Sequence, residues 1–259
     1  MMFRTAQLIL RETNRVLGRT TTSPAFFSRF STAASSSQKL AGKVAVITGG
    51  ASGIGKATAA ENGAKVIIAD VQDDLGRSVA AELGPDAAYT RCDVADEAQV
   101  AAAVDLAVER HGHLDVLFNN AGVSGTIRRQ DDLASMDLAG FDRVMAVNAR
   151  AALVGIKHAA RVMAPRRRGC VLCTASGAGV LSVPSIPVPP RYIAIVRATA
   201  EPLARHGVRV NAISPGAVRT PLMRRVSAEM FLGKSEEELK QIMESDFVIA
   251  PEHVAAAAV

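Results

Sequence analysis

Six short apolar runs alternate along this 259-residue chain with amphipathic stretches of helical period. The runs are rich in Val, Ile and Leu and cover residues 43–48, 65–70, 88–92, 114–119, 170–174 and 208–213. The helical stretches cover residues 54–61, 75–83, 97–111, 138–163 and 193–206. Strands that are apolar throughout and separated by helices indicate a parallel sheet buried on both faces. We therefore predict one α/β domain with a doubly wound parallel sheet.

A glycine-rich turn joins the first predicted strand to the first predicted helix. It reads Thr48-Gly-Gly-Ala-Ser-Gly-Ile-Gly55, and the next strand ends on an acid, Asp70, 21 residues after Gly49. Glycines let the backbone approach a pyrophosphate closely, and the helix N-terminus offers N–H groups and a partial positive charge. Asp70 can accept hydrogen bonds from both ribose hydroxyls and would repel a 2′-phosphate. The pattern predicts a Rossmann-type unit that binds NAD rather than NADP. The residues expected to bind it here are Gly49, Ser52, Gly53, Ile54, Gly55 and Asp70.

Several further motifs follow in an order that resembles the classical short-chain dehydrogenases/reductases. The chain looks closest to the plant alcohol dehydrogenase group that includes tasselseed-2, xanthoxin dehydrogenase and secoisolariciresinol dehydrogenase. The resemblance covers roughly residues 40–259, and the turn has the family spacing Thr-Gly-x-x-x-Gly-x-Gly. The other motifs are Cys92-Asp93-Val94, Asn119-Asn120-Ala121-Gly122, Asn148, Ser176, Asn211-Ala-Ile-Ser-Pro-Gly216 and Thr220.

The resemblance extends the cofactor site beyond the glycine turn. It implies that the Asp93 stretch contacts the adenine, that the asparagine motif packs beside the cofactor, and that the loop before Thr220 grips the nicotinamide carboxamide. The additional cofactor-binding residues are Asp93, Val94, Asn120, Ala121, Gly122, Pro215, Gly216 and Thr220.

The resemblance also implies catalytic roles for Ser176, which would bind the substrate oxygen, and for Asn148, which would hold a proton-relay water. In this family a tyrosine lies 13 residues after the serine and a lysine four residues beyond it. Residues four apart share a helix face, so the ammonium lowers the pKa of the phenol from its usual value near 10 and the tyrosine acts as general base. Counting from Ser176 places Pro189 and Ile193 at these two positions.

A second way of aligning the chain with the family pattern also lacks the tyrosine and lysine pair. Counting back from Val196-Arg-Ala-Thr-Ala200 places Ser185 and Pro189 at the two positions. Tyr192 is the nearby tyrosine, and Val196 follows four residues on. Prolines between residues 183 and 190 oppose a helix there. The general base is therefore unassigned, with Tyr192 as the only tyrosine candidate.

Two functions remain open on this basis. The first is an NAD-dependent oxidoreductase that moves hydride between nicotinamide and a secondary alcohol or ketone of a small metabolite. The second is a catalytically impaired or inactive NAD-binding protein, arising as a splice variant, a faulty gene model or a pseudoenzyme. Apolar residues after Thr220 favour an apolar substrate, although they also fit an amphipathic helix packed on the core.

Two length differences separate the chain from the family pattern. The segment between Gly55 and Asp70 is about three positions short, nearly one helical turn or ~4.5 Å of rise, so the first helix is expected to have about two turns. The chain stops inside the expected last helix, so we expect the last strand of the sheet to be missing. An exposed edge strand would then weaken the homo-oligomer that the resemblance implies.

The net charge of +5 comes from the first forty residues, which hold six basic residues and one acid. Subtracting these from the 30 basic and 25 acidic residues of the chain leaves 24 of each in residues 41–259. The neutral body argues against nucleic-acid binding, and Arg166-Arg167-Arg168 is interpreted as a solvated helix end rather than a phosphate patch. The Arg-rich, Ser/Thr-rich and acid-poor composition of residues 1–40 is typical of an organellar transit peptide, although a disordered leader is the alternative. We expect a mitochondrial location, with chloroplast or cytoplasm as alternatives, and a domain over residues 41–259.

Three cysteines are too few for a disulfide framework, and no apolar run approaches the roughly 20 residues that span a bilayer. Cys170 and Cys173 have C-x-x-C spacing, but residues three apart on a strand point to opposite faces. No second Cys or His pair stands nearby in the sequence. We therefore expect core cysteines, no metal site and no membrane insertion.

Overall fold

The computed structural model describes residues 39–61, 63–125, 137–177, 193–231 and 233–258. The segment Gln38–Val259 forms one compact unit. The predicted leader therefore lies outside the described residues except for its last two positions, Lys39 and Leu40. None of the described helices combines the length and apolar content that crossing a bilayer requires.

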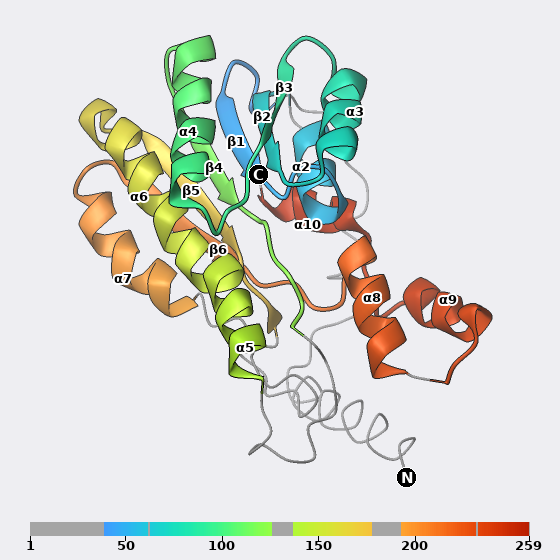
Figure 1. The fold of residues 1–259 in the computed structure, drawn as a ribbon. Helices are drawn as coiled ribbons and strands as arrows, with labels where there is room; N and C mark the ends of the chain where they lie inside the picture. Colours follow the sequence, from blue (N-terminus) through green and yellow to red (C-terminus); the bar gives the residue numbers. More distant parts are fainter. Residues whose placement is uncertain (1–38, 62, 126–136, 178–192, 232, 259) are drawn as a thin grey trace, which may run out of the picture. The chain divides into compact units, whose positions relative to one another are not determined.

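Six parallel strands form one sheet in the order β3-β2-β1-β4-β5-β6 (Figure 1). This is the strand order of the Rossmann fold, in which the direction of winding reverses between β1 and β4. The doubly wound α/β class predicted from the sequence is confirmed, and β6 is the last strand of the described sheet. The strands are β1 (Val44–Thr48), β2 (Lys65–Asp70), β3 (Ala87–Arg91), β4 (Val116–Asn119), β5 (Gly169–Thr174) and β6 (Val208–Ile213).

Each face of the sheet carries its own hydrophobic core, because successive strand residues point to opposite faces. On β2, Ile67 contributes to the core beneath α4, α6 and α7, whereas Ile68 contributes to the core beneath α2 and α3. Both isoleucines are fully buried. The helices here are α2 (Gly53–Ala60), α3 (Asp73–Leu83), α4 (Glu97–His111), α6 (Ala151–Met163) and α7 (Ile193–Ala204).

The predicted helix over residues 138–163 is interrupted, which corrects the expectation of one regular helix. It consists of α5 (Leu138–Met145), a π-helical turn at Ala146–Arg150, and α6. A π turn inserts one extra residue per turn, and such insertions are frequent at functional sites. Periodicity alone could not reveal this turn, because both flanking helices keep an apolar face.

Among the described residues after β6, the helices are α8 (Pro221–Met230), α9 (Glu236–Glu244) and α10 (Pro251–Ala258). No helix was predicted over residues 236–244, although Ser235 and Glu238 form a capping box there. Such a Ser-x-x-Glu pattern is a recognisable helix start. The first crossover helix α2 has eight residues, which agrees with the expected two turns, and it packs against α10.

We predict that Leu117→Ala lowers the free energy of unfolding by about 2–5 kcal/mol, because Leu117 lies in β4 with no exposed surface and its truncation leaves a cavity. The matched control is Leu153→Ala on α6, whose side chain is 49% exposed and which should change stability by less than about 0.5 kcal/mol. Urea denaturation followed by circular dichroism measures both. Equal losses for the two variants would contradict the placement of β4 in the core.

Candidate functional site

The glycine turn between β1 and α2 depends on residues without side chains. Gly49 and Gly53 have φ values of +65° and +53°, a backbone conformation that other residues rarely adopt. A Cβ atom at Gly55 would lie 2.2 Å from the Gly49 carbonyl oxygen and 2.7 Å from Asn120 Nδ2. The turn is therefore folded tightly onto the start of α2, and no larger residue fits at position 55.

The N-terminus of α2 fits an anionic ligand. Its N-cap residue, Ser52, has extended backbone geometry, and its side chain makes no capping hydrogen bond to the helix. The N–H groups of Gly53, Ile54 and Gly55 lie in the first turn, where backbone donors have no partner within the helix and the helix dipole is positive. This arrangement suits a dinucleotide pyrophosphate.

Asp70 is buried at the end of β2, with 5% of its surface exposed. Its Oδ2 accepts a hydrogen bond from the Ala51 N–H of the turn at 3.0 Å, and its Oδ1 accepts one from the Gln72 N–H at 3.0 Å. The Gln72 side-chain amide also donates to Oδ1, at 3.3 Å. An ionised carboxylate has about four acceptor sites, so these three bonds leave room for one further hydroxyl donor. Asp70 thus supports the turn as well as presenting a carboxylate, a second role that the sequence did not indicate.

Hydrogen bonds join the ends of β1, β4 and β5 beside the turn. Thr48 Oγ1 accepts from the N–H groups of Asn120 and Ala121 at 2.9 and 3.1 Å. Asn120 Nδ2 donates to the Thr48 carbonyl oxygen at 3.1 Å, and Thr174 Oγ1 donates to Asn120 Oδ1 at 3.0 Å. Thr48 and Thr174 were not among the predicted site residues, although a hydroxyl residue at the end of an apolar strand is a usable signal.

Asn148 lies in the π turn and binds the backbone of Val123. Its Oδ1 accepts from the Val123 N–H and its Nδ2 donates to the Val123 carbonyl oxygen, each at 2.8 Å. Nearby, Asn119 Nδ2 donates to the Ala152 carbonyl oxygen at 3.1 Å. A Cβ atom at Gly155 would lie 2.1 Å from Asn119 Oδ1, so this glycine makes room for the amide. The side chain of Asn148 therefore fixes the segment after β4.

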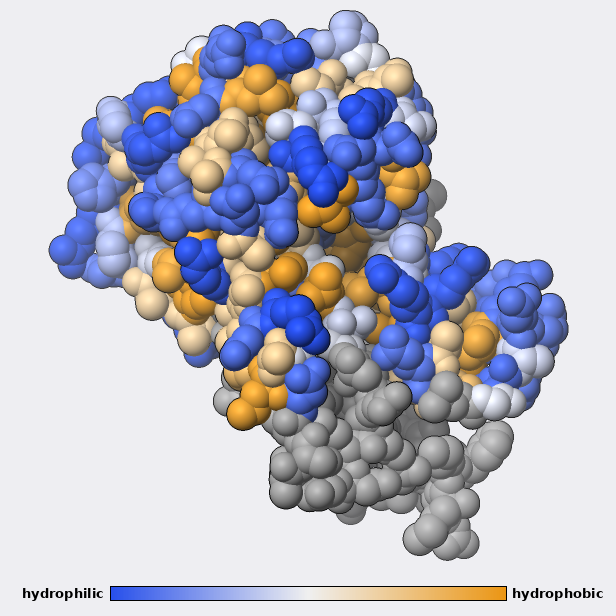
Figure 2. All heavy atoms as spheres, viewed as in Figure 1, coloured by the Kyte–Doolittle hydropathy of each residue, from blue (hydrophilic) through white to orange (hydrophobic). Residues whose placement is uncertain are grey.

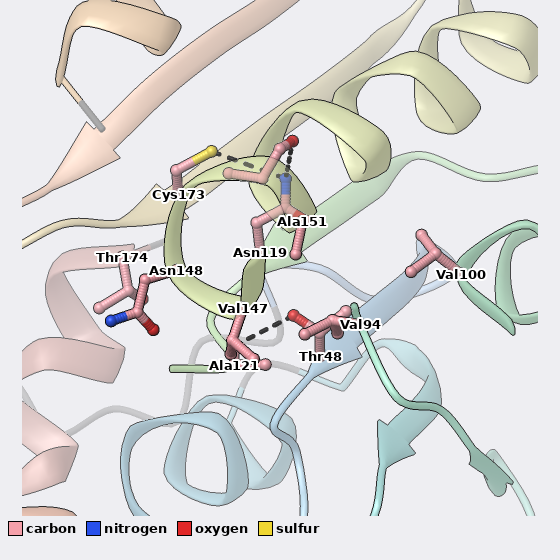
Figure 3. Close-up of a pocket in the computed structure, with 11 residues that line it drawn as sticks. Thr48, Val94, Val100, Asn119, Ala121, Val147, Asn148, Ala151, Cys173 and Thr174 are labelled. Atoms are coloured by element: carbon pink, nitrogen blue, oxygen red, sulfur yellow. Dashed lines mark hydrogen bonds between the residues drawn. The ribbon is translucent and has the colours of Figure 1, made fainter. Parts of the chain in front are cut away.

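A small cavity of about 10 Å³ lies between these groups (Figure 3). Its volume is close to that of one buried water. Polar atoms of Thr48, Asn119, Asn148 and Thr174 and the side chain of Val94 are among those that line it. The structure thus brings together residues from four separate sequence motifs at the carboxyl edge of the sheet.

Asp93 is exposed and lies outside that cavity. Its Oδ1 accepts from the Ala95 N–H at 2.9 Å, and its own N–H donates to Gln99 Oε1 at 2.9 Å. Gly122 is exposed beside Asn148, where a Cβ atom would lie 3.3 Å from Asn148 Oδ1. Both residues remain at the same edge of the sheet as the turn.

Ser176 follows β5 and is held against the segment after β6. The Ala175 N–H donates to the Ile213 carbonyl oxygen at 2.7 Å, and the Gly177 N–H donates to the Pro215 carbonyl oxygen at 2.9 Å. Ser176 is therefore adjacent to Pro215 and Gly216. The positions considered for the tyrosine and lysine, Ser185, Pro189 and Tyr192, lie outside the described residues, and α7 begins at Ile193.

Thr220 connects this segment to the glycine turn. It is the N-cap of α8, and its Oγ1 accepts from the Met223 N–H at 3.1 Å. A Cβ atom at Gly53 would lie 3.0 Å from Thr220 Cγ2, so the two segments are in close contact. The glycine turn and the segment that ends at Thr220, which were both predicted to bind the cofactor, thus lie against each other at the carboxyl edge of the sheet.

Arg166 ends a 3-10 turn (Ala164–Arg166) at the opposite, amino edge of the sheet, and Arg167 and Arg168 follow it, so the predicted helix end is present. Arg166 Nη1 donates to the Leu114 carbonyl oxygen at 3.0 Å, and its Nη2 lies 3.6 Å from Oδ1 of the buried Asp115. Arg168 Nε lies 4.0 Å from the same oxygen. Arg166 and Arg168 therefore lie near a buried carboxylate, whereas Arg167 donates to the Arg205 carbonyl oxygen. Among the described residues, no three His, Cys, Asp or Glu side chains are grouped so as to hold a metal ion.

The strand order and the glycine turn define a Rossmann-type dinucleotide-binding protein. A family model described as enoyl-(acyl carrier protein) reductase matches residues 49–259. Momilactone A synthase of Oryza sativa subsp. japonica is 51% identical over 215 residues, which cover 80% of this chain and 76% of that protein. The chain belongs to the short-chain dehydrogenases/reductases, a family of oxidoreductases that act on alcohols and ketones.

Two further comparisons agree with this assignment. Sex determination protein tasselseed-2 of Zea mays is 47% identical over 195 residues, which cover 72% of this chain and 58% of that protein. The crystal structure of 3-ketoacyl-(acyl-carrier-protein) reductase from Brucella melitensis complexed with NADH aligns with a TM-score of 0.73 and 28% identity. That alignment covers 84% of this chain and 89% of the other. The predicted plant group within the family is confirmed.

The cysteines give a test of the packing beside the cavity. Burial raises the pKa of Cys173, which lines the cavity, to about 11 and that of Cys92 to about 12. At pH 8 the native protein should therefore react with iodoacetamide at these two thiols at least about a hundredfold more slowly than the urea-unfolded chain, because the thiolate is the reactive species. Peptide mass spectrometry reads each site. Cys170, which is less buried, serves as the control, and native labelling of Cys173 faster than Cys170 would contradict the described packing.

Proposed function

We propose that the chain binds NAD or NADH at the glycine turn and transfers hydride between nicotinamide and a secondary alcohol or ketone of a small apolar metabolite. The observation that carries the proposal is the juxtaposition of the tight turn Gly49–Gly55 with the buried carboxylate of Asp70. The turn accepts a pyrophosphate, and the carboxylate lies where the adjoining ribose would be.

The carboxylate favours NAD over NADP on electrostatic grounds. A 2′-phosphate beside Asp70 would place two like charges together at a site where solvent screens them poorly. A ribose hydroxyl, in contrast, donates to the remaining acceptor site of the carboxylate. The bacterial reductase is complexed with NADH in its crystal structure, which is consistent with this preference.

When bound, the nicotinamide supplies or accepts the hydride. The role of this chain is to hold the reacting groups in place. Pro215, Gly216 and Thr220 would hold the carboxamide, and Ser176, fixed between two backbone hydrogen bonds, would bind the substrate oxygen. Asn148 would help to order a water in the neighbouring one-water cavity, while its side-chain amide fixes Val123. The general base is unassigned, and Tyr192, the tyrosine candidate, lies outside the described residues.

An apolar substrate is supported by the surface near the site. Figure 2 shows hydrophobic residues in the hollowed region between α5 and α8. Val123, after β4, and Met145, at the end of α5, are exposed hydrophobic residues. Burial of apolar ligand surface against such residues is the usual source of affinity in small-molecule sites.

A second candidate function is NAD binding without turnover. It is favoured by the sequence between Ser176 and Ile193, where neither register supplies the Tyr and Lys pair. A binding protein of this kind would keep the turn, Asp70 and the adenine contacts, and lose only proton transfer.

Titration with NADH followed by its fluorescence should give saturable binding to the native chain. Gly55→Ala should weaken this binding at least about tenfold, because the added methyl group overlaps the Gly49 carbonyl oxygen and displaces the turn. Ala60→Gly is the control, since it changes one methyl group at the exposed end of the same helix. Absence of NADH binding by the native chain would overturn both candidate functions.

The two functions are separated by turnover. With a panel of apolar secondary alcohols and NAD, the first predicts production of NADH that is lost in Ser176→Ala while NADH binding is kept. Saturable NADH binding with no turnover at any pH from about 6 to 10, a range that spans general-base titration, would reject the first function and support the second.

A further inference from the structure

A cluster of charged side chains at the ends of β2 and β3 adjoins Asp70. Asp70 and Arg91 are register partners on these adjacent parallel strands, whose axes lie about 5 Å apart. Arg91 is therefore the cationic residue of β3 that is next to Asp70, whose carboxylate is proposed to bind the ribose. Asp73, the first residue of α3, stands three positions after Asp70.

Asp73 holds the Arg91 guanidinium. Arg91 Nη1 lies 2.8 Å from Asp73 Oδ2 and donates to the Val71 carbonyl oxygen at 2.9 Å. The guanidinium is thus bound to the loop that follows Asp70. The side chains of Arg91 and Asp73 are 60% and 36% exposed, so a soluble ligand can reach them.

Asp73 is itself held in one orientation. Tyr89 Oη donates to Asp73 Oδ1 at 2.7 Å, and it also lies 2.9 Å from the carbonyl oxygen of Asp70. This hydrogen bond is the main reason that the pKa of Asp73 is lowered, so the carboxylate stays charged. The Tyr89 ring packs on Gly76, where a Cβ atom would lie 2.1 Å from it, and Arg77 lies over the ring at 5.8 Å.

We propose that Asp73 is a positioning residue for cofactor selectivity: it keeps Arg91 paired to the loop after β2 and so prevents this arginine from neutralising a 2′-phosphate beside Asp70. The inference rests on the proposed function and deepens it. Asp70 alone repels a phosphate, but a guanidinium one strand away would offset that repulsion, because Arg binds phosphate through charge-assisted, bidentate hydrogen bonds. By holding Arg91, Asp73 prevents this guanidinium from neutralising the phosphate. Asp73 also lies 4.0 Å from Arg77 Nη2, but Arg91 is the arginine on the strand next to Asp70. Discrimination then depends on the carboxylates of Asp70 and Asp73 and on the pairing of Arg91.

The test measures dissociation constants of NADH and NADPH for the full chain by fluorescence. Asp73→Asn should raise the affinity for NADPH relative to NADH about fivefold, since it releases an exposed guanidinium to a phosphate. Arg91→Ala alone should leave the ratio near that of the native chain, and Asp73→Asn with Arg91→Ala should lose the gain. Asp73→Glu, which keeps the charge, should retain the native preference.

Asp74→Asn is the matched control, because it removes the same charge from the neighbouring residue in the first turn of α3, and the bonds of Arg91 are to Asp73 and Val71 rather than to Asp74. An equal gain in Asp74→Asn, or a gain that survives Arg91→Ala, would overturn the proposal. So would an unchanged ratio in Asp73→Asn.

Should Asp73→Asn fail to fold by circular dichroism, Tyr89→Phe replaces it, since loss of the hydroxyl loosens Asp73 and should move the ratio in the same direction. An unchanged ratio in that variant would equally overturn the proposal. The proposed function is rejected by a different outcome, namely that the native chain binds neither NADH nor NADPH.

Discussion

The hydrogen bond between the Asp70 carboxylate and the Ala51 N–H is the contact on which the site depends. It joins the end of one strand to the glycine turn of the preceding crossover, and it is buried. A buried carboxylate is stable only where such donors compensate for its lost hydration. The turn is therefore positioned by the same acid that would meet the ribose, so binding geometry and charge selectivity are coupled.

The rest of the site is assembled around this turn by the parallel sheet. Carboxyl ends of adjacent strands meet at one edge, and the strand order reverses there. Asn120 crosses from β4 to β1, and Thr174 reaches it from β5. The π turn then allows Asn148 to hold the segment after β4. Distant sequence motifs thus become neighbours through strand pairing rather than through contacts within a motif.

The sequence predicted the elements whose signal is local. The alternation of apolar runs and helices indicated the sheet, and the glycine spacing with Asp70 indicated the turn, because each reflects backbone geometry at a single place. The π turn and the pairing of Asn119 with Gly155 were not predictable in this way, since they depend on how two elements pack. The ion pair between Arg91 and Asp73 was not predicted for the same reason: it joins β3 to α3, and no spacing rule links the two residues.

Hydrogen–deuterium exchange of the native chain, with and without saturating NADH, tests the central claim most directly. With NADH bound, we expect slower amide exchange in residues 48–56 and 120–123, which form the turn and the segment beside it. We expect no change in α9, which lies outside the proposed site. Exchange that is unchanged at the turn, or protection confined to other elements, would contradict the claim that this edge of the sheet binds the dinucleotide.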